Sequence, residues 1–231
     1  MTSNILFGAI LTILVFELSQ WIAKKTKLTL LNPLLVSSML IIALLLILKI
    51  PYSDFDKGGK YFTMLITPAT VSLAIPLYKN LDTLKKNAKV IALGVAVAIL
   101  GHFVFILLLS LAFNLDQNMA LSLIPKSITT AFAKDISTSI GGIEIITVSV
   151  VIVTGIFGAT ISDFVCKKFK FKNDVAIGLA LGSSAHAIGT SKAVENNEIQ
   201  ATFASLALIV TGITTVLVSP FFASILKLII K

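Results

Sequence analysis

Long apolar stretches alternate with short polar connections along the whole chain. The apolar runs cover residues 4–23, 33–50, 61–78, 88–113, 119–140, 143–165, 175–195 and 199–228. Each run is close to the roughly 20 residues that a helix needs to cross the core of a bilayer, and continuous runs of this length favour helix over strand. The pattern therefore predicts an all-α, polytopic membrane protein.

The composition supports this class. Hydrophobic residues make up 56% of the 231 residues, charged residues make up 13%, and the mean hydropathy is +0.99. These values lie outside the range of soluble domains, so we expect one transmembrane domain, residues 1–231, surrounded by membrane lipid. The net charge is +8, but the lysines flank the apolar runs, as they do in the cytoplasmic loops of membrane proteins. That placement argues against a nucleic-acid partner.

The charge pattern also orients the chain in the cytoplasmic membrane. The segments expected in the cytoplasm, because they are rich in lysine, are 24–27, 79–89, 167–172 and the tail with Lys227 and Lys231. Those expected outside, because they lack lysine, are 114–118 and 195–198. If every run crossed the membrane once, the lysine-free segment 114–118 and the lysine-rich segment 167–172 would lie on the same side. A re-entrant hairpin at 119–140 would place them on opposite sides. The prediction is about seven crossings plus this broken segment, with the N-terminus outside and the C-terminus in the cytoplasm.

With this orientation, two groups of three runs have similar hydropathy patterns but cross the membrane in opposite directions. They are 33–50, 61–78 and 88–113, and 143–165, 175–195 and 199–228. Such a relation is typical of an inverted repeat, here with halves 1–115 and 116–231. The middle run of each triplet contains helix breakers, prolines in the first and glycines in the second. We therefore expect discontinuous helices around a transport site.

The stretch SLIPKSITTAF at 122–132 is unusually polar for its expected depth. Pro125 breaks a helix, and the next helix would begin with free N–H groups that attract anions. Lys126 would add a full charge, and Ser127, Thr129 and Thr130 would add hydroxyl donors. An ionised lysine inside a membrane costs about 3 kcal/mol, which suggests an anionic ligand. The alternative is a lysine that reaches the interface from an ordinary loop.

A second polar cluster, GLALGSSAHAIGTSKAVE at 178–195, surrounds a histidine. His186 lies midway along its run, and a charge change near neutral pH would suit proton coupling. The alternative is a structural histidine bonded to a backbone carbonyl. Gly178 and Gly182 have the spacing of a helix-packing face, which needs no ligand.

Two further polar residues lie beside or within apolar runs. His102 is surrounded by apolar residues, which favours a structural role. Asn32 precedes a proline and is expected to cap the second helix, with its amide available to the transport site.

Catalysis is not expected. Ser183 and His186 have the spacing of one helix face, but no carboxylate follows in the run before Glu195, and no protease, hydrolase or nucleotide-binding motif is present. Cys166 is the single cysteine, which excludes an internal disulfide and a multi-cysteine metal site. We expect no enzyme activity, no cofactor and no metal.

Three separated motifs resemble those of the LrgB/CidB family. They are TPATVSLAIPLYKN at 67–80, IPKSITTAFA at 124–133 and SSAHAIGTSKA at 183–193, with LNPLL at 31–35 in agreement. The resemblance implies control of autolysis with a holin-like LrgA or CidA partner in bacteria, movement of pyruvate in some bacterial members, and transport of small hydroxycarboxylates in plant plastid relatives. Ala131 stands where the family commonly has a proline, so the local backbone shape departs from the pattern.

The matching motifs imply a substrate site in several parts. Carried over residue by residue, it consists of Lys126 as the counter-charge for a carboxylate, the donors Ser127, Thr129 and Thr130, the facing half-site His186, Gly189 and Thr190, the broken backbone of Pro68, Ala69 and Thr70, and Asn32.

The resulting hypothesis is a proton-coupled, homo-oligomeric carrier for a small monocarboxylate such as pyruvate, lactate, glycolate or glycerate. Interrupted helices around a buried lysine are typical of carriers, whereas a pore-forming holin needs an amphipathic helix that oligomerises. The alternative is an antiholin-like regulator of murein hydrolase activity and cell lysis that acts with an LrgA- or CidA-type partner.

Overall fold

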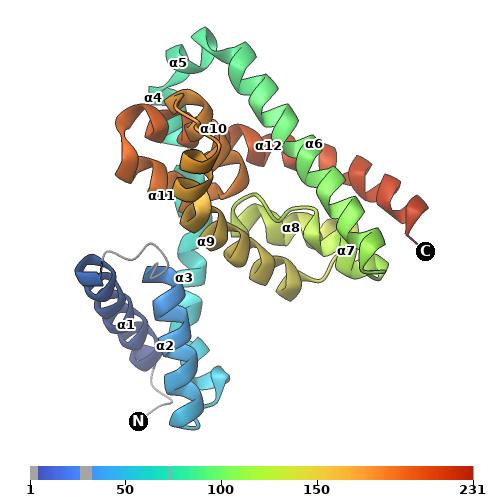
Figure 1. Cartoon of the computed structure of the whole chain (residues 1–231). Helices are drawn as coiled ribbons and strands as arrows, with labels where there is room; N and C mark the ends of the chain where they lie inside the picture. Colours follow the sequence, from blue (N-terminus) through green and yellow to red (C-terminus); the bar gives the residue numbers. More distant parts are fainter. Residues whose placement is uncertain (1–4, 27–32, 73, 231) are drawn as a thin grey trace. The chain divides into compact units, whose positions relative to one another are not determined.

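All regular structure is helical. The computed structural model describes residues 5–26, 33–72 and 74–230, and no strand occurs in these ranges (Figure 1). Of the described helices, four are long and apolar enough to cross a membrane: α1 (Ile5–Thr26), α6 (Ala88–Ala112), α9 (Glu144–Lys168) and α12 (Glu198–Ile229). The shorter ones are α2 (Pro33–Ile47), α3 (Tyr52–Ser72), α4 (Ala74–Lys79), α5 (Leu81–Lys86), α7 (Gln117–Leu123), α8 (Thr130–Ile140), α10 (Asp174–Ser184) and α11 (His186–Asn196). The prediction of an all-α membrane protein is confirmed.

The first helix packs on each of the two helices that follow it. α1 contacts both α2 and α3, and Gly8 allows the close approach to α3, because a side chain there would collide with the backbone of Phe55. Residues 1–72 form one group of contacts and residues 73–231 form a second. The single domain and the repeat halves 1–115 and 116–231 stay predictions.

The predicted run 61–78 is divided between α3 and α4. Pro68 lies inside α3, and Pro76 falls in the first turn of α4, where a missing N–H removes no helical hydrogen bond. Pro68 itself does not end a helix, and because residue 73 between α3 and α4 lies outside the described residues, the expected interruption stays a prediction.

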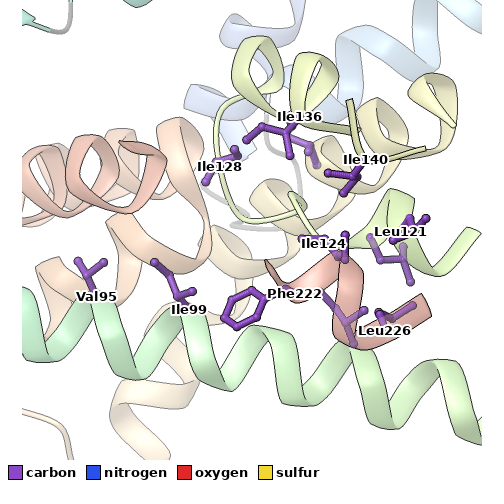
Figure 2. Close-up of a cluster of buried hydrophobic side chains, with 14 of the residues drawn as sticks. Val95, Ile99, Leu121, Ile124, Ile128, Ile136, Ile140, Phe222 and Leu226 are labelled. Carbon is purple, nitrogen blue, oxygen red and sulfur yellow. The ribbon is translucent and has the colours of Figure 1, made fainter. Parts of the chain in front are cut away.

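α6 and α12 build the core of the second group of contacts together with α7 and α8. Figure 2 shows side chains from these helices converging on one another, with Ile99 of α6, Ile124 after α7 and Phe222 of α12 among them. Phe103 stacks on Phe222 with ring centroids 4.1 Å apart. The outward residues of α12 remain apolar, with Leu217 74% exposed, as expected for a helix that faces lipid.

α7 and α8 form a first hairpin. Gln117 at its start donates to the Ile230 carbonyl at 3.5 Å, and Gly141 at its end lies beside the Lys227 amine, so the chain enters and leaves near the end of α12. Gly141 has a φ of 95°, the left-handed conformation that lets glycine end a helix. The predicted doubling back of 119–140 is confirmed.

Buried hydroxyl groups fix the base of this hairpin to α9. The Thr147 hydroxyl lies 2.9 Å from the Ser122 carbonyl and 2.6 Å from the Ser137 hydroxyl. The Ser122 hydroxyl accepts from the Ile143 N–H at 2.6 Å. Buried polar groups satisfied in this way hold elements in a defined position.

α10 and α11 form a second hairpin. The Asp174 carboxylate accepts hydrogen bonds from Gln200 at 2.7 Å and from Asn197 at 3.0 Å, so the chain enters and leaves near the start of α12. Gly182 brings α10 against α12, because a side chain there would collide with the Ala204 carbonyl. The run 175–195, predicted as one interrupted crossing, instead turns back at His186.

The second hairpin changes the expected orientation. Because it turns back, 167–172 and 195–198 lie at one end of the bundle, where α12 begins, and Lys227 lies at the other end beside Gly141. The predictions that 195–198 faces away from 167–172, and that Lys227 shares the side of 167–172, are wrong. The triplet 143–165, 175–195 and 199–228 does not alternate, so the inverted repeat is not shown in the predicted form.

α6 runs in the same direction as α12. Its Gly94 lies against Leu179 of α10, near the start of α12, and its Phe103 stacks on Phe222 toward the other end. The lysine-rich segment 79–89 before α6 is therefore at the same end as 167–172, which agrees with the expectation that they share a side.

Candidate functional site

The tip of the α7–α8 hairpin is a short segment between two helix ends. Pro125 is fully buried and has no N–H to continue α7. Thr129 has an extended conformation, with φ −63° and ψ 146°, and α8 begins at the next residue. The first N–H groups of α8 have no partner within the helix, so this tip carries the positive end of the α8 dipole.

Lys126 lies at this tip with weak partners. Its Nζ is 3.4 Å from the Ser127 hydroxyl and 5.6 Å from the centroid of the Phe105 ring. In the described ranges, no carboxylate lies within 4.0 Å of this amine. The lysine is therefore a partly buried cation without a counter-charge among the described side chains.

Ser127 connects the tip to α6 and α12. Its hydroxyl, in a side chain only 5% exposed, lies 3.5 Å from the His102 Nε2. Both residues line a cavity of about 20 Å³ with Thr215, and the remaining walls are apolar: Ile99, Phe103, Ile106, Ile124, Ile128 and Phe222. This volume holds about one water molecule.

Thr129 and Thr130 adjoin this cavity segment in the chain. The Thr129 hydroxyl is buried and has no hydrogen-bond partner within the described ranges, and it makes no capping bond to α8. An unpaired buried hydroxyl costs about 1–3 kcal/mol, so its presence suggests a ligand or water partner. Thr130 is the first residue of α8 and is partly buried.

His186 forms the tip of the second hairpin. Its φ is 41°, and its Nε2 lies 2.9 Å from the Val151 carbonyl of α9. Gly155 of α9 makes room for the ring, because a side chain there would collide with it. The bond to a backbone carbonyl is the one expected of a structural histidine.

Gly189 and Thr190 serve the packing of the second hairpin. A side chain at Gly189 would collide with the Leu181 carbonyl of α10, and the Thr190 hydroxyl donates to the His186 carbonyl at 2.9 Å. Gly178 likewise faces the backbone of Gln200 in α12. The glycines thus form the packing face that their spacing indicates, and neither Gly189 nor Thr190 lines the cavity.

The remaining predicted site residues belong to the first 72 residues of the chain. Pro68 is exposed and lies inside α3. Asn32 lies outside the described residues, as do the side chains of Ala69 and Thr70. Their place in a substrate site stays a prediction.

His102 and Thr215 were not predicted as site residues. Each lies on a long helix and is brought to Ser127 by tertiary packing. The signal available for His102 is that it is a lone histidine in an apolar run. No local signal marks Thr215. In the part of the chain that the structure describes, no group of three or more His, Cys, Asp or Glu side chains is placed to hold a metal ion.

The comparisons with known proteins agree over nearly the whole chain. The LrgB-like family matches residues 12–225. The chain is 37% identical over 221 residues to the antiholin-like protein LrgB of Bacillus subtilis, a match that covers 95% of this chain and 96% of the relative. It is 36% identical over 214 residues to the uncharacterized protein YwbG of the same organism, covering 93% of this chain and 95% of the relative.

A third relative, the antiholin-like protein LrgB of Bacillus mycoides, is 35% identical over 217 residues, covering 94% of each chain. No solved structure matches. The sequence matches confirm the resemblance indicated by the three motifs, and the chain belongs to the LrgB-like family.

Proposed function

We propose that this chain is an antiholin-like membrane protein that regulates murein hydrolase activity and cell lysis together with an LrgA- or CidA-type partner. The observation that carries the proposal is the match to two relatives named antiholin-like protein LrgB, each covering at least 94% of this chain. The apolar helices that suit a membrane are consistent with a partner that is also embedded in lipid.

The regulatory function is tested in cells that lack their own LrgB-like protein. Autolysis is followed by the fall in turbidity after detergent challenge, with this chain expressed alone, with an LrgA-type partner, or not at all. The proposal expects slower lysis that requires the partner, and co-purification of the two proteins. Unchanged lysis in all three strains, with no co-purification, contradicts it.

A second function, a carrier for a small monocarboxylate, is favoured by one observation. Lys126 is a partly buried cation without a carboxylate partner, at the tip of a hairpin that meets α6 and α12 midway along their length. A helix start and a lysine together suit an anionic ligand. Because the cavity holds about one water, admission of a substrate would require the hairpins to move apart.

The carrier function is tested with the purified protein in lipid vesicles. Labelled pyruvate or glycolate is offered to vesicles with the unchanged chain, with Lys126→Ala and with Lys134→Ala, a matched lysine whose amine is 2.8 Å from Glu144. The expected result is saturable uptake that Lys126→Ala abolishes and Lys134→Ala retains. Uptake that appears only when an LrgA-type partner is added supports a joint carrier, and conductance without saturation indicates a channel.

We also propose that the lysine-rich end of the second group of contacts faces the cytoplasm, in the cytoplasmic membrane. The segments 79–89 and 167–172 lie at this end, and lysine-rich connections favour the cytoplasmic side. With this orientation, Ile230 lies toward the outside, opposite to the predicted cytoplasmic C-terminus.

A further inference from the structure

A chain of three polar groups crosses from the α7–α8 tip to α6. The Lys126 Nζ lies 3.4 Å from the Ser127 hydroxyl, and this hydroxyl lies 3.5 Å from the His102 Nε2. The surrounding cavity wall is apolar apart from Thr215. The Ser127 hydroxyl and the His102 imidazole thus line one small, mostly apolar cavity, and the Lys126 amine reaches this hydroxyl without lining the cavity itself.

The chemistry of these groups sets the direction of the chain. A lysine ammonium only donates, so the Ser127 oxygen accepts from it, and the serine hydrogen is left to be donated to His102. A neutral imidazole can accept at Nε2, whereas a protonated imidazole cannot. In this arrangement the empty site holds one positive charge, on Lys126.

Through the Ser127 hydroxyl, His102 is connected to one charged group, Lys126. α12 presents Thr215 and Phe222, and the α10 residue packed on α6 near Gly94 is Leu179. None of these three residues titrates. Two cations on either side of the Ser127 hydroxyl would repel each other, and an anion bound beside them offsets that repulsion.

We propose that His102 carries the proton that accompanies a carboxylate through this protein. When the carboxylate binds at Lys126, its negative charge favours a protonated His102, so that one anion enters with one proton. The loaded site, with a protonated histidine, a lysine and an anion, has the same net charge as the empty site. This inference rests on the carrier function proposed above and names the residue of its proton coupling.

His186 does not fit this role. Its Nε2 lies 2.9 Å from the Val151 carbonyl, and a carbonyl only accepts, so this nitrogen keeps its proton. Its ring is also held against Gly155. Since the sequence has two histidines, His186→Gln is a matched control for His102→Gln.

The experiment uses the full chain in vesicles that contain a trapped pH-sensitive dye, with pyruvate as the probe. One assay measures net pyruvate uptake driven by an inside-alkaline pH gradient. The other measures exchange of labelled for unlabelled pyruvate at equal pH, which needs no net proton movement. For His102→Gln, net uptake and internal acidification should fall at least about tenfold, while exchange persists.

The possible outcomes separate this inference from the carrier function. If His102→Gln keeps pH-driven uptake, or if His186→Gln alone uncouples it, the assignment is overturned and the carrier stands. If His102→Gln and His102→Asn both melt like the unchanged protein but lose exchange as well, His102 serves binding and the assignment is again overturned. If the unchanged protein shows neither uptake nor exchange, the carrier function and the assignment both fail.

Discussion

The Lys192 amine lies 3.1 Å from the Asp163 carboxylate, an ion pair that joins α11 of the second hairpin to α9. The lysine side chain is only 17% exposed, so the pair is partly shielded from water. A cavity of about 150 Å³ lies beside it, lined by Asp163 and Cys166, which are one helical turn apart. Because Cys166 is the single cysteine of the chain, its rate of alkylation reports on this contact without the need to introduce another cysteine.

Breaking the Asp163–Lys192 pair should make Cys166 easier to alkylate. A partly exposed ion pair contributes up to about 1 kcal/mol, so Lys192→Met, which leaves the Asp163 charge beside Cys166 in place, should speed N-ethylmaleimide labelling about fivefold. Glu195→Gln is the control, because Glu195 lies 3.8 Å from Lys192 and is 71% exposed. Equal labelling rates in both variants would show that this pair does not hold the hairpin against α9.

Gly182 and Gly101 should respond to alanine in opposite directions. A Cβ at Gly182 would collide with the Ala204 backbone, whereas a Cβ at Gly101 meets nothing within 4 Å. Gly182→Ala should therefore destabilise the protein by about 1–3 kcal/mol, and Gly101→Ala should be neutral or stabilising by up to about 1 kcal/mol. The check is thermal unfolding in detergent, and a loss at Gly101 as large as that at Gly182 would contradict the close approach of α10 to α12.

Replacing Lys126 by methionine should stabilise the fold while removing carrier activity. The amine is partly buried without a carboxylate among the described residues, and an ionised lysine in a membrane costs about 3 kcal/mol. Residues kept at such a cost commonly serve function rather than stability. A lower melting temperature for Lys126→Met than for Lys134→Met would indicate that Lys126 is structural.

The base of the second hairpin should lose stability in acid. Hydrogen bonds from Gln200 and then Asn197 hold the pKa of Asp174 below its usual range. A carboxylate with a lowered pKa stabilises the fold above its unfolded value of about 3.9, and this contribution is lost as the pH falls through the lower folded value. The melting temperature of the unchanged chain should therefore fall over this range more steeply than that of Asp174→Asn. Asp135→Asn, at an exposed residue of α8, should keep the steeper fall.

Cysteines at the hairpin bases should be labelled from opposite sides of the membrane. In a Cys166→Ser background, Asn118→Cys and Ser139→Cys mark the base of the first hairpin, and Lys172→Cys and Asn196→Cys mark that of the second; all four positions are exposed. An impermeant thiol reagent added to intact cells should label the first pair and spare the second. Labelling of positions 172 and 196 from different sides would mean that α10 and α11 cross the membrane as one segment.

The sequence was sufficient for the long helices and for the first hairpin. α6, α9 and α12 follow from apolar runs of membrane-spanning length. The first hairpin follows from the different lysine content of 114–118 and 167–172, and Pro125 marks its turn. The second hairpin has no such signal, since a run of this length suits either one crossing helix or two short ones. Its turn lies at His186 with a φ of 41°, where a glycine would have been the expected marker.

The site was predictable only where neighbours in the chain form it. Lys126 and Ser127 are adjacent, and a proline announces the break before them. His102 lies 25 residues from Ser127 in the sequence, and Thr215 lies 88 residues from it. Both meet Ser127 because α6 and α12 pack around the tip. Likewise, the run 175–195 forms a hairpin because Gln200 donates a hydrogen bond to Asp174. A contact between residues so far apart in the sequence cannot be predicted from a local pattern.

Both hairpins depend on a helix that follows them in the chain. Phe132 of the first hairpin packs on Gly212, and Asp174 of the second is held by Gln200, both residues of α12. During translation, at about 5–20 residues per second, each hairpin leaves the ribosome before the surface that secures it has been made. The packing of both polar turns can therefore be completed only after α12 has been synthesised.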